Sequence, residues 1–214
     1  MLCLSLVATS VSAAPGIATL TKPPDIGIGA LVIGDNTGNS AGSVEADTAG
    51  WTLTVADAGT LAAGSMVATQ AVTATGVGST TTIVDTGLTQ ANDFWNGWSI
   101  VCVTGHASNV GQMVAVLDFN SSTDTLTTAA FPAATAEGDT FTLYKALAAA
   151  LELCTTGGGT FGDIVAYETA LQGLGGYGGV GTFSIPLYIK QTVANTDPPG
   201  AYSITLTYTT TPGE

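Results

Sequence analysis

Apolar and polar residues alternate along most of this 214-residue chain, which is the pattern of strands with one buried face. The alternation is clearest in five segments: Trp51 to Val55, Thr82 to Asp85, Met113 to Leu117, Phe141 to Leu143 and Ile204 to Tyr208. Turn-forming residues separate such segments at Asp35 to Gly38, Asn96-Gly97, Asn120 to Ser122, Glu137 to Asp139 and Asp197 to Gly200. Short strands between frequent turns predict an all-β fold, either a sandwich or a barrel.

Two stretches depart from this pattern. Residues Lys145 to Leu153 are mostly strong helix formers, but no N-cap residue precedes them and Thr155 to Gly157 ends the run at once. We therefore expect a strand at Ala150 to Leu153 rather than a helix. The segment from Gly157 to Gly181 is rich in glycine, and it predicts a long loop or a pair of weak strands.

The middle of the chain has the properties of a separate unit. Residues 67–146 carry their own strands, turns and aromatic residues, and removing them would join the flanking segments into one sandwich. We therefore predict a β-sandwich made of residues 14–66 and 147–214, with a small β-barrel or β-sandwich module inserted at 67–146. In the outer part, Trp51, Leu53 and Val55 share one face of a strand and are expected to be buried.

The first thirteen residues resemble a secretory signal peptide. A short apolar run from Leu2 to Val11 is followed by Val11-Ser12-Ala13, a small-x-small pattern that predicts cleavage after Ala13. The run is too short to span a membrane. The alternative is that residues 1–13 form an ordinary N-terminal strand or arm. Export predicts an extracellular or cell-surface location.

The charge balance excludes several classes of partner. The chain has sixteen acidic residues, three lysines (Lys22, Lys145 and Lys190) and no arginine, so its formal net charge is −13. Binding to DNA, RNA or anionic lipid requires basic side chains that displace counterions. We therefore expect neither a nucleic-acid partner nor an anionic lipid surface, and the short apolar run predicts no membrane span.

The sequence offers little catalytic or metal-binding chemistry. His106 is the only histidine, and no serine stands in a G-x-S-x-G motif. The glycine runs lack the Lys-Ser/Thr ending of a phosphate-binding loop. Oxygen ligands occur at Asp35-Asn36 and from Asp118 to Asp124, but neither segment matches a calcium-binding EF-hand loop. We expect no enzyme activity, no cofactor and no metal site.

Two cysteines lie beyond the N-terminal segment, Cys102 in the middle unit and Cys154 in the outer part. In an exported protein they could form one disulfide. The alternative is that they are two buried free thiols, and their placement in different predicted units favours this interpretation.

The densest group of aromatic residues is formed by Phe94, Trp95 and Trp98. If exposed, these rings could stack on sugars, and they are our candidate glycan-contact residues. The alternative is that they fill the core of a small β-module, with at least one tryptophan pointing inward.

The two ends of the chain contain candidate assembly strands. Gly16 to Thr21, with Ile17 and Leu20, lies between prolines and can pair as an edge strand. The last strand contains Ile204 and Leu206. Either segment could pair with another copy in a homo-oligomer or filament, or both could pair within their own sandwich.

The outer part resembles the WxL-type domains of bacterial surface proteins. The resemblance rests on Asp47 to Val55, in which Trp51-x-Leu53 is the W-x-L element, and on the closing segment from Ile185 to Tyr208. Tyr208-Thr209-Thr210 stands where the family has its second W-x-L element. The resemblance implies a non-catalytic β-sandwich at the cell surface.

The middle unit is similar to small β-modules of phage and other surface structural proteins. The similar segments are Thr80 to Asp85, Asp93 to Trp98, Gly111-Gln112, Asp118 to Leu126, Phe131-Pro132 and Gly138 to Phe141. Taken together, the sequence predicts a non-enzymatic extracellular structural or adhesive protein that binds cell wall or glycan or assembles with itself. The alternative is a structural protein of a virion, such as a capsid decoration or tail component.

Overall fold

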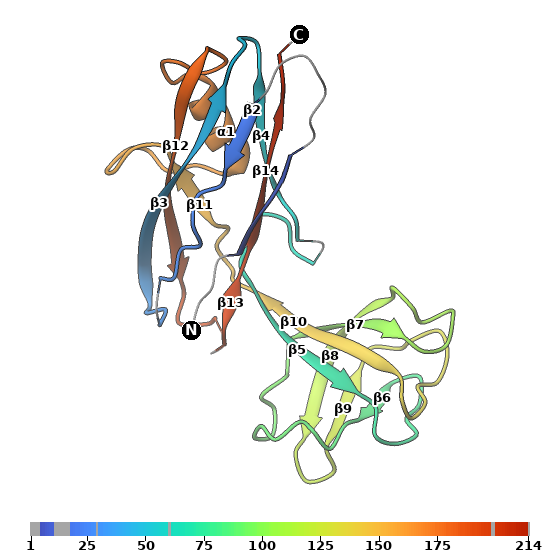
Figure 1. Cartoon of the computed structure of the whole chain (residues 1–214). Helices are drawn as coiled ribbons and strands as arrows, with labels where there is room; N and C mark the ends of the chain where they lie inside the picture. Colours follow the sequence, from blue (N-terminus) through green and yellow to red (C-terminus); the bar gives the residue numbers. More distant parts are fainter. Residues whose placement is uncertain (1–4, 11–17, 29, 60, 198–199, 214) are drawn as a thin grey trace. The chain divides into compact units, whose positions relative to one another are not determined.

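The computed structural model describes residues 5–10, 18–28, 30–59, 61–197 and 200–213 (Figure 1). It divides into two compact units, an outer unit of Met1–Val67 with Ala146–Glu214 and an inserted unit of Ala68–Lys145. The inserted unit differs by one residue at each end from the expected 67–146. Within the described residues, no helix is long and apolar enough to cross a membrane.

The outer unit is a sandwich of two sheets, which confirms the expected fold class. One sheet has the strand order β1-β14-β4 and the other β11-β12-β3-β2 (Figure 1). Its elements are β1 (Ser5–Ser10), β2 (Ala18–Thr21), β3 (Gly34–Ala46), β4 (Thr52–Asp57), β11 (Glu152–Cys154), α1 (Ile164–Gln172), β12 (Gly181–Val193), β13 (Tyr202–Ser203) and β14 (Thr205–Thr211).

The longest pairing joins β3 to β12, which are antiparallel over thirteen residues each. Asp35 to Gly38 was expected to be a turn, but it lies inside β3. The cause is the buried side chain of Asn36, whose amide nitrogen donates to the carbonyl oxygens of Val32 (2.8 Å) and Gly34 (2.9 Å). Its side-chain oxygen accepts from the Val32 N–H at 2.9 Å. Asn36 therefore fixes the segment before β3 instead of turning the strand.

The glycine-rich stretch contains a helix, so the expectation of a loop or weak strands from Gly157 to Gly181 was wrong there. Asp163 caps α1 by accepting a hydrogen bond from the Ala166 N–H at 2.8 Å. Tyr167 and Leu171, four residues apart, are the buried side chains of the helix. The expected strand at 150–153 is found at residues 152–154, as β11.

Side chains of α1 and the turns after it cover the outer edge of β4. The Val55 N–H donates to Glu168 at 2.7 Å, and the Leu53 N–H donates to the Tyr177 hydroxyl at 2.8 Å. The Trp51 indole N–H donates to the Gly179 carbonyl oxygen at 2.7 Å. Trp51 and Leu53 are each 1% exposed, which confirms the prediction that they are buried. Glu168 and Tyr177 thus accept hydrogen bonds from backbone N–H groups of β4 that would otherwise face solvent.

Two buried tyrosines connect α1 to both sheets. The Tyr208 hydroxyl of β14 donates to the Tyr167 hydroxyl of α1 at 3.4 Å, and Tyr167 donates to the Pro186 carbonyl oxygen of β12 at 2.9 Å. Because β11 pairs only with residues 188–190 of β12, the Pro186 carbonyl lies beyond its reach. Burial raises the pKa of Tyr208 to about 12 and that of Tyr167 further still.

The inserted unit is built from β5 (Val67–Thr73), β6 (Thr82–Val84), β7 (Ser99–Thr104), β8 (Met113–Asn120), β9 (Thr125–Thr128) and β10 (Thr140–Ala146). They lie in the order β5-β10-β7-β8-β9-β6. Just beyond β5, the Thr75 N–H donates to the Val84 carbonyl oxygen of β6 at 2.8 Å. This bond links the first and last strands of that order, so the sheet curls into a small barrel.

Each unit holds one of the two described cysteines. Cys102 lies in β7 and Cys154 in β11, and both are buried free thiols. Of the two interpretations of the sequence, the structure therefore has the free thiols. They take part in the cores as small apolar side chains.

We expect Trp51→Ala to lower the free energy of unfolding of the outer unit by about 3–5 kcal/mol, because it removes a fully buried ring. Trp51→Phe keeps an aromatic ring but loses the bond to Gly179, so its loss should be smaller. Urea denaturation followed by circular dichroism measures both. An alanine variant within about 1 kcal/mol of the parent would contradict the core role of Trp51.

We expect a fragment of residues 68–145 to fold without the rest of the chain, because its strands close on one another around their own core. Differential scanning calorimetry of the fragment should show one cooperative transition. The outer unit, with its two segments joined by a short linker, is the matched counterpart. A fragment that melts without cooperativity would show that the inserted unit depends on the outer one.

The buried tyrosines predict alkaline sensitivity. An unfolded tyrosine loses its proton near pH 10, whereas the folded chain holds the Tyr208 proton to about pH 12. The contribution of the buried Tyr208 to the free energy of unfolding is therefore fully present below about pH 10, and it falls as the pH rises from there through about 12. Urea midpoints measured across this range should fall less steeply for Tyr208→Phe, whereas Tyr188→Phe, at a half-exposed position, should follow the parent. Equal slopes for all three proteins would refute the assignment.

Candidate assembly face

One outward face of the inserted unit is apolar. In β7, Ile100 and Cys102 point into the core, so Val101 and Val103 point outward. In β8, Val116 is buried and Met113 is exposed. Met113 lies directly opposite Val101 in the antiparallel pair, which places the two strands' apolar residues next to one another.

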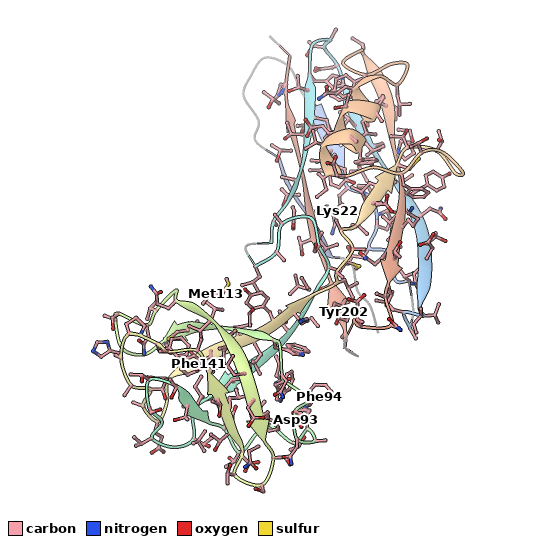
Figure 2. All side chains as sticks on the ribbon, turned by 180° about the vertical axis from the view of Figure 1, so that it is seen from behind. Lys22, Asp93, Phe94, Met113, Phe141 and Tyr202 are labelled. Atoms are coloured by element: carbon pink, nitrogen blue, oxygen red, sulfur yellow. The ribbon has the colours of Figure 1, made fainter. Side chains whose placement is uncertain are left out.

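The side chains of this face are far more exposed than is usual for large apolar residues. Val103 is 50% exposed, Met113 48% and Leu117 59%. Figure 2 shows Met113 at the outside of the unit and Phe141 in its interior. Leu117 stands at a register shift of β8 between Val116 and Asp118, and this bulge presents its side chain to solvent. We call Val101, Val103, Met113, Ala115 and Leu117 the apolar face.

A tyrosine borders the apolar face on the neighbouring strand. Tyr144 of β10 lies opposite Ser99 of β7, and its hydroxyl donates to the sulfur of Met113. This contact places the Met113 side chain beside the Tyr144 ring. Tyr144 itself is buried, so the exposed apolar surface lies on β7 and β8.

Charged side chains lie mostly away from this face. The inserted unit has six acidic residues and one lysine between residues 68 and 145. Asp85 and Asp139 are buried and accept backbone hydrogen bonds, and Lys145 donates to the Gly97 carbonyl oxygen at 2.6 Å. Asp118, beside Leu117, is the one carboxylate that β7 and β8 contribute. In a chain of net charge −13, two copies repel one another least where such a face meets its equal.

The aromatic cluster expected as a glycan platform belongs largely to the core. Trp95 and Trp98 are buried, with ring centroids 4.7 Å apart in an edge-to-face arrangement, and Phe94 is half-buried. Buried indoles leave no ring face for a sugar to stack on. The core-filling alternative accounts for both tryptophans.

The candidate assembly strands are placed as follows. Ile17 lies outside the described residues. Leu20 lies in β2, opposite Val44 of β3. Ile204 and Leu206 are buried, and β14 has β4 on one edge and β1, in parallel, on the other. The last strand therefore has no open edge in this chain, so pairing with another copy would require β1 to leave it.

The polar residues considered for chemistry remain scattered. The Ser108 hydroxyl lies 2.8 Å from Nδ1 of His106, but both side chains are exposed and only two residues apart in one turn. In the part of the chain that the structure describes, no three His, Cys, Asp or Glu side chains gather as metal ligands would. A nucleophile also needs a base that a third group holds in place, and the hydrogen bonds of His106 involve only Ser108 and backbone atoms.

The fold and these surfaces define an all-β protein with an exposed apolar face and no assembled catalytic group among the residues described. No family model matches the sequence, and no curated protein matches it. Among solved structures it is similar to VP17, a capsid protein of bacteriophage P23-77, at 9% identity and a TM-score of 0.26, covering 91% of this chain and 95% of that one. The complex of the two major capsid proteins VP16 and VP17 of the same phage is similar at 9% identity and a TM-score of 0.24, covering 92% and 98%. Similarities this low support no argument about the chain.

Proposed function

We propose that this chain is a non-enzymatic structural protein whose copies assemble through the apolar face of the inserted unit. The observation that carries the proposal is the exposure of Val103, Met113 and Leu117 on neighbouring strands. Contiguous apolar patches on the surface of a folded domain mark contact sites. Because the first and last strands of the barrel are linked, strand addition at its edges is restricted. Association of the inserted unit would therefore gain free energy mainly by burying the apolar side chains of this face.

A second copy is the occupant that the charge distribution favours. A cationic partner would need carboxylates to pair with, and the face carries only Asp118. A partner surface rich in acids would find no basic side chain on β7 or β8 to pair with. A copy of the same face is apolar and carries the same single carboxylate at its end, so a two-fold contact can set the apolar residues together and keep the two Asp118 side chains apart.

We propose a virion as the setting of this assembly, with the cell surface as the alternative. The observation that favours the virion is β1, in which Ser5–Ser10 pairs in parallel with β14 along six residues. Removal of residues 1–13 as a signal peptide would take this strand out of the sheet. Export, cell-wall binding and membership of the WxL family remain predictions. Trp51 and Leu53 of the W-x-L element are core residues and unavailable to a partner.

The assembly is tested with a double variant of the apolar face, Val103→Thr with Leu117→Gln. Both changes keep side-chain size close to the original and make exposed positions polar, so folding should be unchanged. Sedimentation velocity over a concentration series should show a defined oligomer for the parent and mostly monomer for the variant. Val77→Thr changes a still more exposed valine of the same unit, outside β7 and β8, and should assemble like the parent.

Two outcomes would contradict the proposal. One is a parent chain that stays monomeric at every concentration, and the other is a double variant that assembles as well as the parent. Mass spectrometry of the N-terminus in assembled material decides the setting, since a retained residue 1–13 segment supports the virion and a start at Ala14 supports export.

A further inference from the structure

A loop folds over the outward face of the outer unit's larger sheet. After β11, residues 155–162 return to the sheet, and Gly162 forms a bridge with Leu153 through hydrogen bonds of 2.7 and 2.9 Å. The turn that the loop makes requires glycines. A side chain at Gly157 would meet the ring of Tyr188 at 3.2 Å, and Gly158 has a φ of +79°. The glycines therefore allow the loop backbone to pack closely against the Tyr188 ring.

The space between this loop and the sheet is a cavity of about 380 Å³. Phe161 comes from the loop, Tyr188 from β12, and Thr37 and Asn39 from β3, with Gly158 at the rim. Tyr188 and Asn39 are directly opposite one another in the β12–β3 pair. A second cavity of about 240 Å³ adjoins the other part of the loop, and Phe161 lines both.

The lining selects for an uncharged ligand. It contains no acidic, basic or histidine side chain. The closest cation is Lys190, which lies 5.3 Å from the centre of the Phe161 ring and is held by Glu152 at 2.7 Å. This ion pair raises the pKa of Lys190 and leaves no free positive charge for an anion. For a cation, the carboxylate of Glu152 is taken by this pair, and that of Asp35, two residues before Thr37, accepts from the Thr192 hydroxyl at 2.6 Å and lies outside the lining.

The same lining combines two aromatic rings with neutral hydrogen-bonding groups. Phe161 and Tyr188 offer flat apolar surfaces, and Thr37, Asn39 and the Tyr188 hydroxyl offer donors and acceptors at half-exposed or exposed positions. A sugar ring has apolar C–H faces and a rim of hydroxyl groups, so its two kinds of surface match these two kinds of side chain. The cavity volume lies in the range of small-molecule sites.

The loop is held in place before any ligand arrives. The Leu153–Gly162 bridge fixes one end, and α1 begins immediately afterwards at its cap, Asp163. Within the loop, the Cys154 thiol donates to the Thr156 carbonyl oxygen at 3.1 Å. A ring presented by a fixed loop loses little conformational entropy on binding.

We propose that the cavity formed by Phe161, Tyr188, Thr37 and Asn39 binds one ring of a neutral sugar. The site is separate from the apolar face of the inserted unit and from the aromatic cluster at Phe94. It does not depend on the assembly proposed above, and a chain that fails to assemble could still bind through it.

The test is an NMR titration of the full chain with methyl β-glucoside, methyl β-galactoside and N-acetylglucosamine. At least one should bind with a dissociation constant in the millimolar range, as a single weakly held ring does. The shifted amide signals should come from residues 37–39, 157–162 and 188–190. Cyclohexanol has a similar apolar ring without the set of hydroxyls, and glucuronate adds a negative charge. Both should bind at least about tenfold more weakly than the best neutral sugar.

Variants then assign the contacts. Phe161→Leu should weaken binding about tenfold, because it removes the flat ring but keeps an apolar side chain, whereas Phe161→Tyr should bind like the parent. Asn39→Ala should weaken binding with no change in the melting temperature, because Asn39 is exposed. The proposal is overturned if no sugar shifts these signals at tens of millimolar, if cyclohexanol binds as well as the sugars, or if Phe161→Leu binds like the parent.

Discussion

The constraint on which the outer unit depends is that the edge of β4 must be closed without another strand. Its outer N–H groups are taken by Glu168 and by the hydroxyl of Tyr177, both on the segment between β11 and β12. The same segment brings Tyr167 between the sheets, where its hydroxyl reaches the β12 carbonyl that β11 leaves open. One short helix therefore closes a sheet edge, fills the core and determines where the loop over β12 can run.

That closure determines which surfaces are left for contact. β4 is covered by side chains, and β14 lies between two strands, so the smaller sheet offers its edge only at β1. The inserted barrel is closed through Thr75. With the β4 edge covered and the barrel closed, association by strand addition is restricted at these places, and association by sheet faces is favoured there. The outward residues of β7 and β8 form such a face, and this is the physical link between the fold and the proposed assembly.

The sequence predicts where most strands lie, but it predicts which side of a strand is buried only for some of them. Trp51 to Val55 alternates strictly between apolar and polar residues, so its buried face could be assigned. Met113 to Leu117 was counted among the alternating segments, but it is apolar at every position, so alternation cannot tell which residues point outward, and the apolar face could not be found. The helix was missed because it lies within a glycine-rich stretch and begins with two β-branched residues. Its stability comes from the burial of Tyr167 and Leu171. The cavity depends on the register of β3 against β12, which composition does not contain.

The scarcity of basic residues connects the two proposed sites. With sixteen acids and three lysines, the chain cannot offset carboxylates at an interface with its own cations. Two of the lysines, Lys22 and Lys190, are already paired with acids, and Lys145 is bound to a backbone carbonyl. A contact between copies must then rely mainly on apolar burial and neutral hydrogen bonds. The apolar face and the Phe161 cavity are both built from uncharged side chains, apart from Asp118 at one end of the face. In the proposed assembly, the acids at turns would favour hydration of the separate copies and the apolar faces would favour contact between them, so one composition would serve both.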